Sequence, residues 1–375
     1  MKVLITGANG FIGKNLRLHL SERKDIETIC FTRSDTIDSL RDKLRDVDFV
    51  FHLAGVNRPK EENEFIIGNT DLSAKLCQEI EFINKETAKK IPVIFTSSTQ
   101  ADYENAYGKS KRLAEDQFFS LGKTSDVPIY IFRLPNVFGK WCKPNYNSVV
   151  ATFCHNIANN IPISIRNNES EIRLAYIDDI VRLFISIMDG EMIEKTSDGF
   201  SIIKPVYSYT VGELAQKIHE FQSSRTSLIS ERVGTDFVRA LHATYLSYLP
   251  TDKFAYSVPQ HSDPRGTFVE MLKTPDCGQF SFFTAHPGVT RGGHYHHSKT
   301  EKFLVIDGEA QFRFRHMLTN ETYELVTSGD KSTIVETVPG WTHDITNIGK
   351  NKLVVMLWAN EIFDREHPDT FPSSL

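Results

Sequence analysis

Short apolar runs alternate with longer amphipathic stretches over roughly the first 200 residues. The runs are apolar throughout, which is typical of parallel strands that are covered on both faces. The stretches between them, such as 71–85 and 109–120, have the period of amphipathic helices. This alternation predicts an α/β Rossmann-type, doubly wound parallel sheet. The runs expected to be strands are Val3–Ile5, Thr28–Phe31, Phe49–His52, Val93–Thr96 and Ile129–Arg133.

The pattern changes after about residue 245, where helical periods give way to short β-type runs separated by Gly, Asp, Asn and Pro. Many short strands at close spacing predict an all-β sandwich or barrel. A chain of 375 residues also exceeds the usual size of one hydrophobic core. We therefore predict an α/β domain at 1–245 and an all-β domain at 252–375. The strands expected in the second domain include Phe280–Thr284, Lys302–Ile306, Ala310–Arg315 and Lys352–Trp358.

Composition and charge argue against several classes of partner. The formal net charge is −5 and no long run of Lys or Arg occurs, so a nucleic-acid partner is not expected. The longest apolar runs, near 183–188 and 353–359, are too short to span a membrane. The five cysteines are dispersed and form no CxxC pair. We therefore expect reduced thiols in a soluble, cytoplasmic protein.

A glycine-rich turn follows the first predicted strand and opens a helix. Gly7, Gly10 and Gly13 have the spacing GxxGxxG. Glycine there permits a tight turn, close approach to a pyrophosphate and close helix–strand packing, and the helix N-terminus offers N–H groups to phosphate oxygens. A purely structural glycine turn is the alternative. We expect the turn, together with Phe11 and Ile12, to bind a dinucleotide cofactor.

The ends of the next two strands carry further expected cofactor contacts. An acidic residue after the second strand would bond the ribose 2′-hydroxyl of NAD, whereas arginine accommodates the 2′-phosphate of NADP. Arg33 stands there and predicts NADPH, with an exposed, merely solvated arginine as the alternative. At the end of the third strand, Leu53, Ala54 and Gly55 are small enough for the chain to run beneath the nicotinamide ribose.

Tyr107 and Lys111 form a YxxxK pair at the start of a predicted helix, where this spacing places them on one helical face. The lysine ammonium, with the charge of the cofactor, can lower the phenol pKa so that tyrosine exchanges a proton near neutrality. A nearby hydroxyl can hold the substrate oxygen. Ser98 is the first choice for that hydroxyl, and Thr99 is the alternative.

Taken together, these motifs resemble those of the extended short-chain dehydrogenases/reductases, the superfamily of nucleotide-sugar epimerases, dehydratases and reductases. Segments 133–139 (RLPNVFG) and 173–179 (RLAYIDD) match as well, and the blocks cover about the first 180 residues in the family's order. The resemblance implies that Tyr107 donates a proton, that Lys111 orients it and binds ribose, and that Ser98 polarises the substrate carbonyl.

The same resemblance implies where the substrate binds. In this superfamily the substrate lies near the segment that contains Asn136, and a residue in the position of Arg173 contacts the diphosphate. A surface salt bridge is the alternative role of Arg173.

Four candidate metal ligands stand in the all-β half of the chain. His294 and His296 alternate on a predicted strand, so both project to the same face, and Glu301 and His343 arrive from neighbouring strands. Three imidazoles and a carboxylate suit a divalent ion, zinc first, with iron, nickel or manganese as alternatives. We expect one ion per chain; a histidine-lined barrel without metal is the alternative.

The spacing of these residues resembles the two motifs of the cupin family of jelly-roll barrels. The first motif runs from Gly288 to Gly308 without departure, and the second, at 338–347, departs only in beginning with Val338. Upstream, segment 261–270 (HSDPRGTFVE) resembles the opening strand of the sugar-nucleotide 3,5-epimerase cupins. The resemblance implies a metal-binding epimerase domain.

A reductase of this superfamily followed by a cupin resembles the bifunctional enzymes of capsular polysaccharide biosynthesis, on the route to UDP-N-acetyl-L-fucosamine. The resemblance implies that the cupin inverts C3 of a UDP-2-acetamido-2,6-dideoxy-4-hexulose. The reductase then reduces the C4 ketone with NADPH to UDP-2-acetamido-2,6-dideoxy-β-L-talose. A C4 ketone acidifies the C3 proton, so inversion needs a base, an acid and an enolate stabiliser. A homodimer is the family expectation.

Two other functions remain open. In one, the protein is only a reductase and the cupin is a structural metal and dimerisation module. In the other, the protein is a dinucleotide sensor without turnover. The complete set of Ser98, Tyr107 and Lys111 argues against a sensor, and the match at 263–270 argues against an inert cupin. The sequence leaves open which residue is the C3 base and whether the metal is catalytic.

Overall fold

The computed structural model of the chain describes residues 1–259, 261–263, 266–268, 272, 278–361 and 366–375. The chain divides into two compact units. The first unit contains residues 1–137 and 173–207, and the second contains 138–172 and 208–375. The predicted domain boundary at 245–252 lies inside the second unit and stays a prediction.

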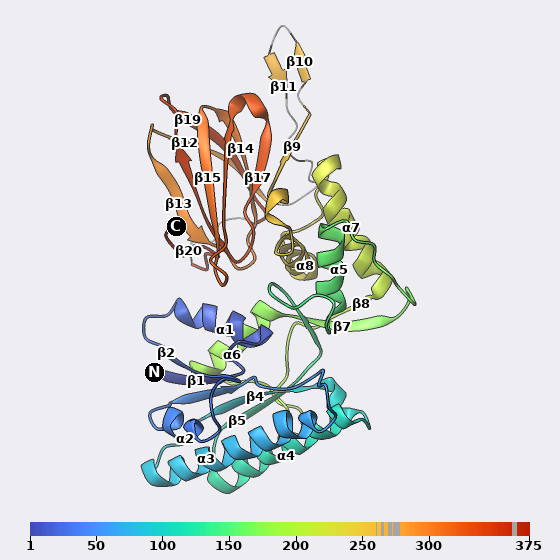
Figure 1. Cartoon of the computed structure of the whole chain (residues 1–375), viewed down its shortest axis with the longest axis vertical. Coiled ribbons are helices and arrows are strands. Elements are labelled where there is room, and N and C mark those ends of the chain that lie inside the picture. The colour runs from blue at the N-terminus through green and yellow to red at the C-terminus, as the bar shows by residue number, and fades with distance from the viewer. Residues whose placement is uncertain (260, 264–265, 269–271, 273–277, 362–365) are drawn as a thin grey trace. The chain divides into compact units, whose positions relative to one another are not determined.

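The first unit is built on a parallel five-stranded sheet with the order β2–β1–β3–β4–β5. The middle of the sheet is apolar and buried, as in β3 (FVFH, buried throughout), because helices cover both faces. In Figure 1, α1 and α6 lie on one face and α3 and α4 on the other. The predicted α/β architecture is therefore confirmed. The strands are β1 (Lys2–Thr6), β2 (Glu27–Phe31), β3 (Phe49–His52), β4 (Val93–Ser98) and β5 (Ile129–Leu134), and the helices are α1 (Phe11–Ser21), α2 (Ser39–Leu44), α3 (Leu72–Thr87), α4 (Ala106–Ser125) and α6 (Ile177–Met188).

The order of the strands reverses at one point of this sheet. From β1 the chain passes to β2 on one side and later to β3 on the other, so the winding reverses between β1 and β3. In open α/β sheets, ligands bind beyond the carboxyl ends of the strands at this reversal. The glycine turn follows β1 at this point.

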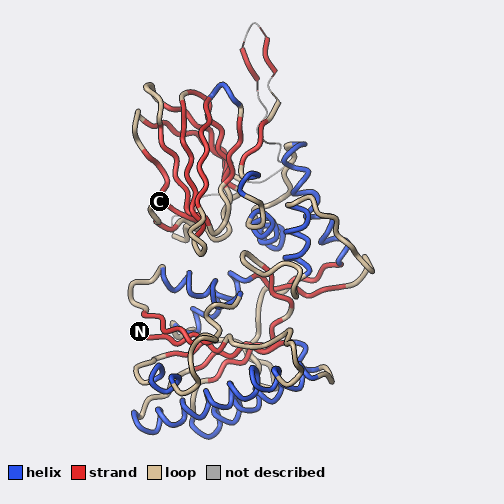
Figure 2. The backbone as a smooth tube through the Cα atoms, in the orientation of Figure 1, coloured by secondary structure: helices blue, strands red, loops and turns tan. Residues whose placement is uncertain are grey.

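The second unit contains two five-stranded antiparallel sheets, which Figure 2 shows as its red strands. Their orders are β12–β19–β14–β17–β9 and β16–β15–β18–β13–β20. Two such sheets form a jelly-roll fold, which confirms the predicted all-β cupin architecture. The strands are β9 (Ala255–Ser257), β12 (Gln279–Ala285), β13 (Thr290–Tyr295), β14 (Glu301–Asp307), β15 (Glu309–His316), β16 (Thr322–Ser328), β17 (Thr333–Glu336), β18 (Trp341–Asn347), β19 (Leu353–Ala359) and β20 (Phe371–Pro372). A separate hairpin pairs β10 (His261–Asp263) with β11 (Gly266–Phe268).

Three helices belong to the same unit as these sheets. They are α5 (Val149–Ala158), α7 (Val211–Ser227) and α8 (Asp236–Leu246). Arg225 of α7 forms an ion pair with the buried Glu336, whose other oxygen lies 2.7 Å from Lys302 Nζ. Buried charges are stable only when paired, so this cluster joins the helices to β14 and β17. A further small sheet has the order β6 (Asn136–Phe138), β7 (Glu171–Tyr176) and β8 (Tyr207–Thr210).

Within the described residues, no helix combines the length and the apolar character needed to cross a membrane. The described cysteines, Cys30, Cys77, Cys142 and Cys154, are free thiols.

Candidate active site and metal centre

The start of α1 has the geometry of a phosphate-binding turn. Gly10 occupies the N-cap position, and Phe11 and Ile12, both half-buried, form the first turn. A Cβ atom at Gly13 would lie 2.4 Å from the carbonyl oxygen of Gly7. No side chain fits at that distance, so the helix can start this close to β1 only with glycine there.

Gly7 lies directly against the end of β3. Its φ of +68° is in the left-handed region, and a Cβ atom on it would lie 2.7 Å from the Ala54 nitrogen. Thr6 holds the two chain segments together, because its Oγ1 accepts from the Ala54 N–H at 3.2 Å and its carbonyl oxygen from the Leu53 N–H at 3.2 Å. The turn and segment 53–55, both predicted to contact the cofactor, therefore form one continuous backbone surface.

His52, just before segment 53–55, is buried and holds this segment in place through hydrogen bonds to Thr6 and Ser73. Its Nδ1 lies 2.7 Å from Thr6 Oγ1 and its Nε2 lies 2.9 Å from Ser73 Oγ. Burial, with the charge of Lys111, lowers the pKa of His52 to about 3. The ring is therefore neutral, and its two hydrogen bonds hold the end of β3 against Thr6 and Ser73.

Arg33 is exposed in the turn that follows β2, as its sequence position predicts. Asp35 shapes this turn, since its carboxylate accepts from the Thr32 N–H at 2.7 Å and lies 3.1 Å from Lys43 Nζ. Arg33 itself is exposed beside this turn, where a ligand can reach its guanidinium.

Ser98, Tyr107 and Lys111 come together where β4 ends and α4 begins. Ser98 and Tyr107 share a side-chain hydrogen bond. Lys111 Nζ donates to the carbonyl oxygen of Thr96 at 2.9 Å. Thr99, the alternative to Ser98, is exposed. The structure thus brings a hydroxyl to a phenol, and it holds the Lys111 ammonium at the end of β4, one helical turn further along α4.

Burial sets the ionisation of this group. It raises the pKa of Tyr107 above its usual value, and the hydrogen bond with Ser98 offsets only part of that effect. The predicted lowering of the phenol pKa includes the charge of the cofactor and stays a prediction; in the protein alone, desolvation of the phenolate sets the direction of the shift. Burial also lowers the pKa of Lys111 to about 8, although the charge of Glu115 acts in the opposite direction. Near neutrality Tyr107 holds its proton and most Lys111 is charged.

Polar side chains that sequence reasoning missed hold these groups in place. Asn69, which is buried, accepts from the Val56 N–H at 2.8 Å and donates to Ser110 Oγ at 3.0 Å. Asn105 caps α4 by accepting from the Gly108 N–H at 2.8 Å. An asparagine just before a helical pattern is a known start signal, so Asn105 could have been found. The sequence around Asn69 contains no motif that marks its role.

Asn136 and Arg173 are both exposed on neighbouring strands, β6 and β7. Asn136 Nδ2 donates to the carbonyl oxygen of Arg173 at 3.3 Å. The structure therefore brings the two predicted substrate contacts together and leaves the Arg173 guanidinium exposed.

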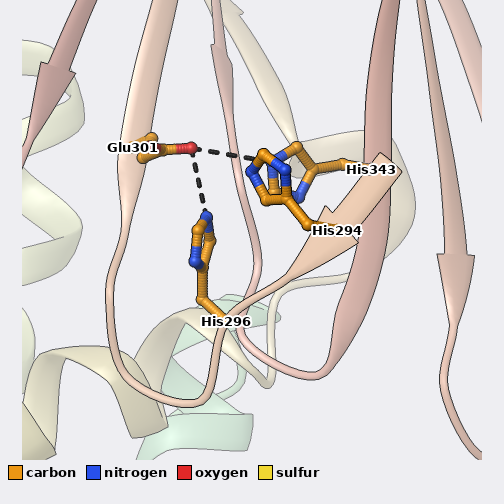
Figure 3. Close-up of side chains that lie close together, drawn as sticks. All are labelled: His294, His296, Glu301 and His343. Atoms are coloured by element: carbon orange, nitrogen blue, oxygen red, sulfur yellow. Dashed lines mark hydrogen bonds and ion pairs between the residues drawn. The ribbon is translucent and has the colours of Figure 1, made fainter. Parts of the chain in front are cut away.

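The four predicted metal ligands converge inside the jelly roll, as Figure 3 shows. One ligand atom from each of His294, His296, Glu301 and His343 lies within 4.8 Å of the others. Glu301 Oε2 lies 3.2 Å from His296 Nε2 and 3.6 Å from His343 Nε2. All but His294 are buried, and His294 is half-buried.

The pairing of β13 with β18 explains this convergence. His294 lies directly opposite His343, after a register shift between Gly292 and His294. Gly292 has a φ of +98°, and a Cβ atom there would lie 3.0 Å from Asp344 Cα. Glycine therefore permits the bulge that turns His294 toward the other ligands.

The cluster is electrostatically costly without a cation. Burial, together with His343 and His296, lowers the pKa of His294 to about 4. Burial also lowers the pKa of His343, whose two ring nitrogens have no hydrogen-bond partner. Burial acts to raise the pKa of Glu301, but the positive charge of His296 and its hydrogen bond hold it well below the usual value. Buried, unpartnered imidazole nitrogens beside a carboxylate are what a divalent ion satisfies.

One predicted segment lies partly outside the described residues. Of the epimerase-like stretch 261–270, Pro264, Arg265, Val269 and Glu270 are not described. The resemblance carried by Arg265 and Glu270 therefore stays a prediction.

The parallel sheet with its glycine turn and the added jelly roll define the class: a Rossmann-type dehydrogenase or epimerase fused to a β domain. Residues 3–195 match the NAD dependent epimerase/dehydratase family, and residues 261–371 match the polysaccharide biosynthesis C-terminal domain. The chain belongs to the NAD dependent epimerase/dehydratase family.

Two relatives and one solved structure refine this placement. The chain is 60% identical to the UDP-2-acetamido-2,6-beta-L-arabino-hexul-4-ose reductase of Pseudomonas aeruginosa, over 100% of this chain and 99% of that protein. It is 27% identical to the dTDP-4-dehydro-6-deoxyglucose reductase of Escherichia coli, over 50% of this chain and 73% of that protein. The crystal structure of the capsular polysaccharide assembling protein CapF from Staphylococcus aureus matches over 100% of both chains, with a TM-score of 0.68 and 39% identity.

Proposed function

We propose that this protein is an NADPH-dependent reductase of a UDP-linked 4-keto-6-deoxy amino sugar, and that its cupin domain inverts C3 of the same sugar. The observation that carries the reductase is the Ser98–Tyr107–Lys111 group in a chain 60% identical to a UDP-sugar reductase over its whole length. The proposed product is UDP-2-acetamido-2,6-dideoxy-β-L-talose. A homodimer in the cytoplasm, with domains at 1–245 and 252–375, is part of the proposal.

The residues that would hold the cofactor line the reversal point of the sheet. The first turn of α1, which Gly10 caps and which includes Gly13, would offer its N–H groups to the pyrophosphate, and Leu53, Ala54 and Gly55 would continue that surface. Arg33 would meet the 2′-phosphate that distinguishes NADPH from NADH. When bound, the nicotinamide supplies a hydride. Glycine at position 7 lets the turn lie against the end of β3, because a Cβ atom there would clash with Ala54.

Tyr107 is the proton donor of this proposal. Reduction of a ketone needs a proton on the oxygen as hydride reaches the carbon, and a phenol with a raised pKa holds that proton near neutrality. Ser98 would donate a second hydrogen bond to the same oxygen and polarise the carbonyl. Lys111, anchored on Thr96, would contact ribose and stabilise the phenolate that remains. Arg173 would bind the diphosphate and Asn136 the sugar.

The jelly-roll cluster fits a divalent ion, and we propose zinc, one per chain. His294, His296, Glu301 and His343 supply the four-coordinate nitrogen and oxygen donor set that zinc prefers. The unpartnered nitrogens of His343 support this assignment. A bound ion would supply positive charge to a substrate oxygen. Phe303 and Phe314 lie beside His343, at 6.3 and 6.4 Å between ring centres, and border the cluster with apolar surface.

Inversion at C3 needs the C4 ketone, and reduction removes it. The two reactions therefore have a fixed order, epimerisation and then reduction, which gives a reason for one chain to carry both domains. A second candidate function is a reductase whose jelly roll serves only as a structural metal and dimerisation module. The name of the Pseudomonas relative, which mentions only a reductase, favours this alternative.

The test is incubation of the full chain with a UDP-2-acetamido-2,6-dideoxy-4-hexulose and NADPH, with the product stereochemistry determined by NMR. The bifunctional proposal predicts an alcohol at C4 with C3 inverted. A C4 alcohol that retains the starting C3 configuration would support the reductase-only alternative. Failure to oxidise NADPH would overturn both.

A further inference from the structure

Two of the proposed metal ligands, His296 and Glu301, are joined by a four-residue loop, 297–300. This loop leaves β13 and enters β14, and its residues are buried. A buried backbone must find hydrogen-bond partners for its N–H groups. The partners of this loop are side chains from distant parts of the chain.

Asp369, in the segment after the last long strand, provides most of those partners. Its Oδ1 accepts from the His297 N–H at 2.8 Å, and its Oδ2 accepts from the N–H groups of Ser298 at 2.7 Å and Lys299 at 2.6 Å. Ser298 Oγ also donates to Oδ2, at 3.0 Å. One carboxylate thus accepts hydrogen bonds from three successive backbone N–H groups, which is the geometry of an anion-binding nest.

The rest of the connection is fixed in the same way. The Thr300 N–H donates to Asn360 Oδ1 at 2.8 Å. The N–H of the ligand Glu301 donates to Thr337 Oγ1 at 2.8 Å. Every N–H from 297 to 301 therefore has a side-chain acceptor, and Asp369 supplies three of the five.

Asp369 also contacts a ligand directly through its backbone. Its carbonyl oxygen forms a short hydrogen bond with His296 Nδ1. A carbonyl oxygen can only accept, so the proton lies on Nδ1. Nε2, which faces Glu301 Oε2 at 3.2 Å, is then the ring nitrogen left to bind an ion. Fixing the outer nitrogen of a histidine in this way sets its tautomer and ring orientation for a metal.

The segment that follows Asp369 runs along β13, the strand that carries the ligand His294. Phe371 pairs with Tyr295, Pro372 pairs with His294, and the Ser373 N–H donates to the Gly293 carbonyl oxygen at 2.8 Å. The C-terminal segment is therefore attached to both sides of the ligand His296.

We propose that Asp369 is a positioning residue of the metal site: its carboxylate shapes the loop between two ligands and its carbonyl orients the ring of His296. This inference rests on the metal site of the proposed function. Removal of the carboxylate frees three buried N–H groups, and the loop then no longer holds His296 and Glu301 at one point. The cost should appear as weaker zinc binding, in addition to any loss of general stability.

The experiment compares the full chain with Asp369→Ala, Asp369→Asn and His343→Ala, and uses Asp307→Asn as the control because Asp307 is an exposed carboxylate on β14. Zinc is removed with a chelator, and zinc affinity is measured by competition with a chromogenic chelator. Each protein is also melted with and without zinc. Loss of an outer-shell partner of a metal ligand lowers affinity by roughly 10–100-fold.

Asp369→Ala should show that loss, and its melting temperature should gain less from zinc than that of the parent chain. Asp369→Asn should lose less, because its amide keeps one acceptor oxygen, and Asp307→Asn should match the parent. Should Asp369→Ala fail to fold, Asp369→Asn decides: affinity below that of the control supports the proposal. A variant that melts lower but binds zinc like the parent would overturn it, since Asp369 would then be only structural. A parent chain that binds zinc no better than His343→Ala would overturn the metal site itself.

Discussion

The two candidate sites of this protein are assembled in contrasting ways. The reductase group takes Ser98, Tyr107 and Lys111 from one strand end and the helix that follows it, and the groups are held by hydrogen bonds that need no ligand. The jelly-roll cluster takes its four ligands from three separate strand regions and includes the buried ring of His343, whose nitrogens lack a hydrogen-bond partner. Local chain geometry builds the first site. Long-range strand pairing and, by our proposal, a bound ion build the second.

The largest effect that tests this contrast should come from the charge cluster on the outer face of β14. The buried Glu336 pairs with Arg225 and Lys302. Lys302 is next to Glu301 on β14, and because side chains alternate along a strand, Glu301 faces the metal site on the opposite side. Glu336→Gln should lower the free energy of unfolding by roughly 3–5 kcal/mol, because it leaves two cations buried without their partner. Chemical denaturation measures this, with Glu321→Gln at an exposed position as the control.

A loss no greater than that of the control would show that the cluster adds nothing to stability. The jelly roll would then be stable through its own sheets alone. The metal site would not need support from distant residues, and it would differ less from the reductase group.

A smaller effect is expected at Arg33 in the first site. If its guanidinium meets the 2′-phosphate, Arg33→Ala should remove roughly 1.5–3 kcal/mol of NADPH binding, the usual range for a hydrogen bond to a charged group. The ratio of kcat/KM for NADPH to that for NADH should fall about 10–100-fold. Arg45→Ala, another exposed arginine of the same unit, should leave the ratio unchanged. Equal kcat/KM values for the two cofactors in the parent chain would contradict the assignment.

The third expected effect is gradual and confined to alkaline pH, and it comes from Lys111. Burial lowers its pKa from 10.5 to about 8, so its charge is present below that pH and is lost above it. Since kcat/KM reports the free enzyme, its value for NADPH should fall about tenfold per pH unit above about 8. Stability should move oppositely and rise between about pH 8 and 10.5, because the unfolded chain binds more protons there. A flat kcat/KM profile up to pH 10 would refute the role of Lys111.

The contrast also explains how much the sequence could predict. The five strands of the first unit and the glycine turn are recognisable because period and spacing are local properties of the chain. His294 and His343 could be found by motif spacing, although they meet only through the pairing of β13 with β18.

The supports of both sites could not be predicted, because they depend on residues far apart in the chain. Asn69 reaches Ser110, and Asp369 reaches the loop at 297–299, with no local pattern to mark either. The raised pKa of Tyr107 could not be predicted for a related reason. It is caused by burial, which depends on the whole folded protein, whereas the YxxxK spacing indicates only that a lysine lies on the same face of the helix.

Tyr107→Phe in deuterium oxide separates the two activities that we propose for this chain. This change removes the phenolic proton and leaves the jelly-roll residues intact. Oxidation of NADPH should fall by roughly 10²–10⁴-fold, the usual contribution of a positioned acid, while deuterium still enters C3 of the 4-keto sugar at the parent rate. Tyr103→Phe, at an exposed tyrosine, should retain both activities. The account is contradicted if Tyr107→Phe shows no C3 exchange above the buffer rate, or if it still reduces the ketone as fast as the parent.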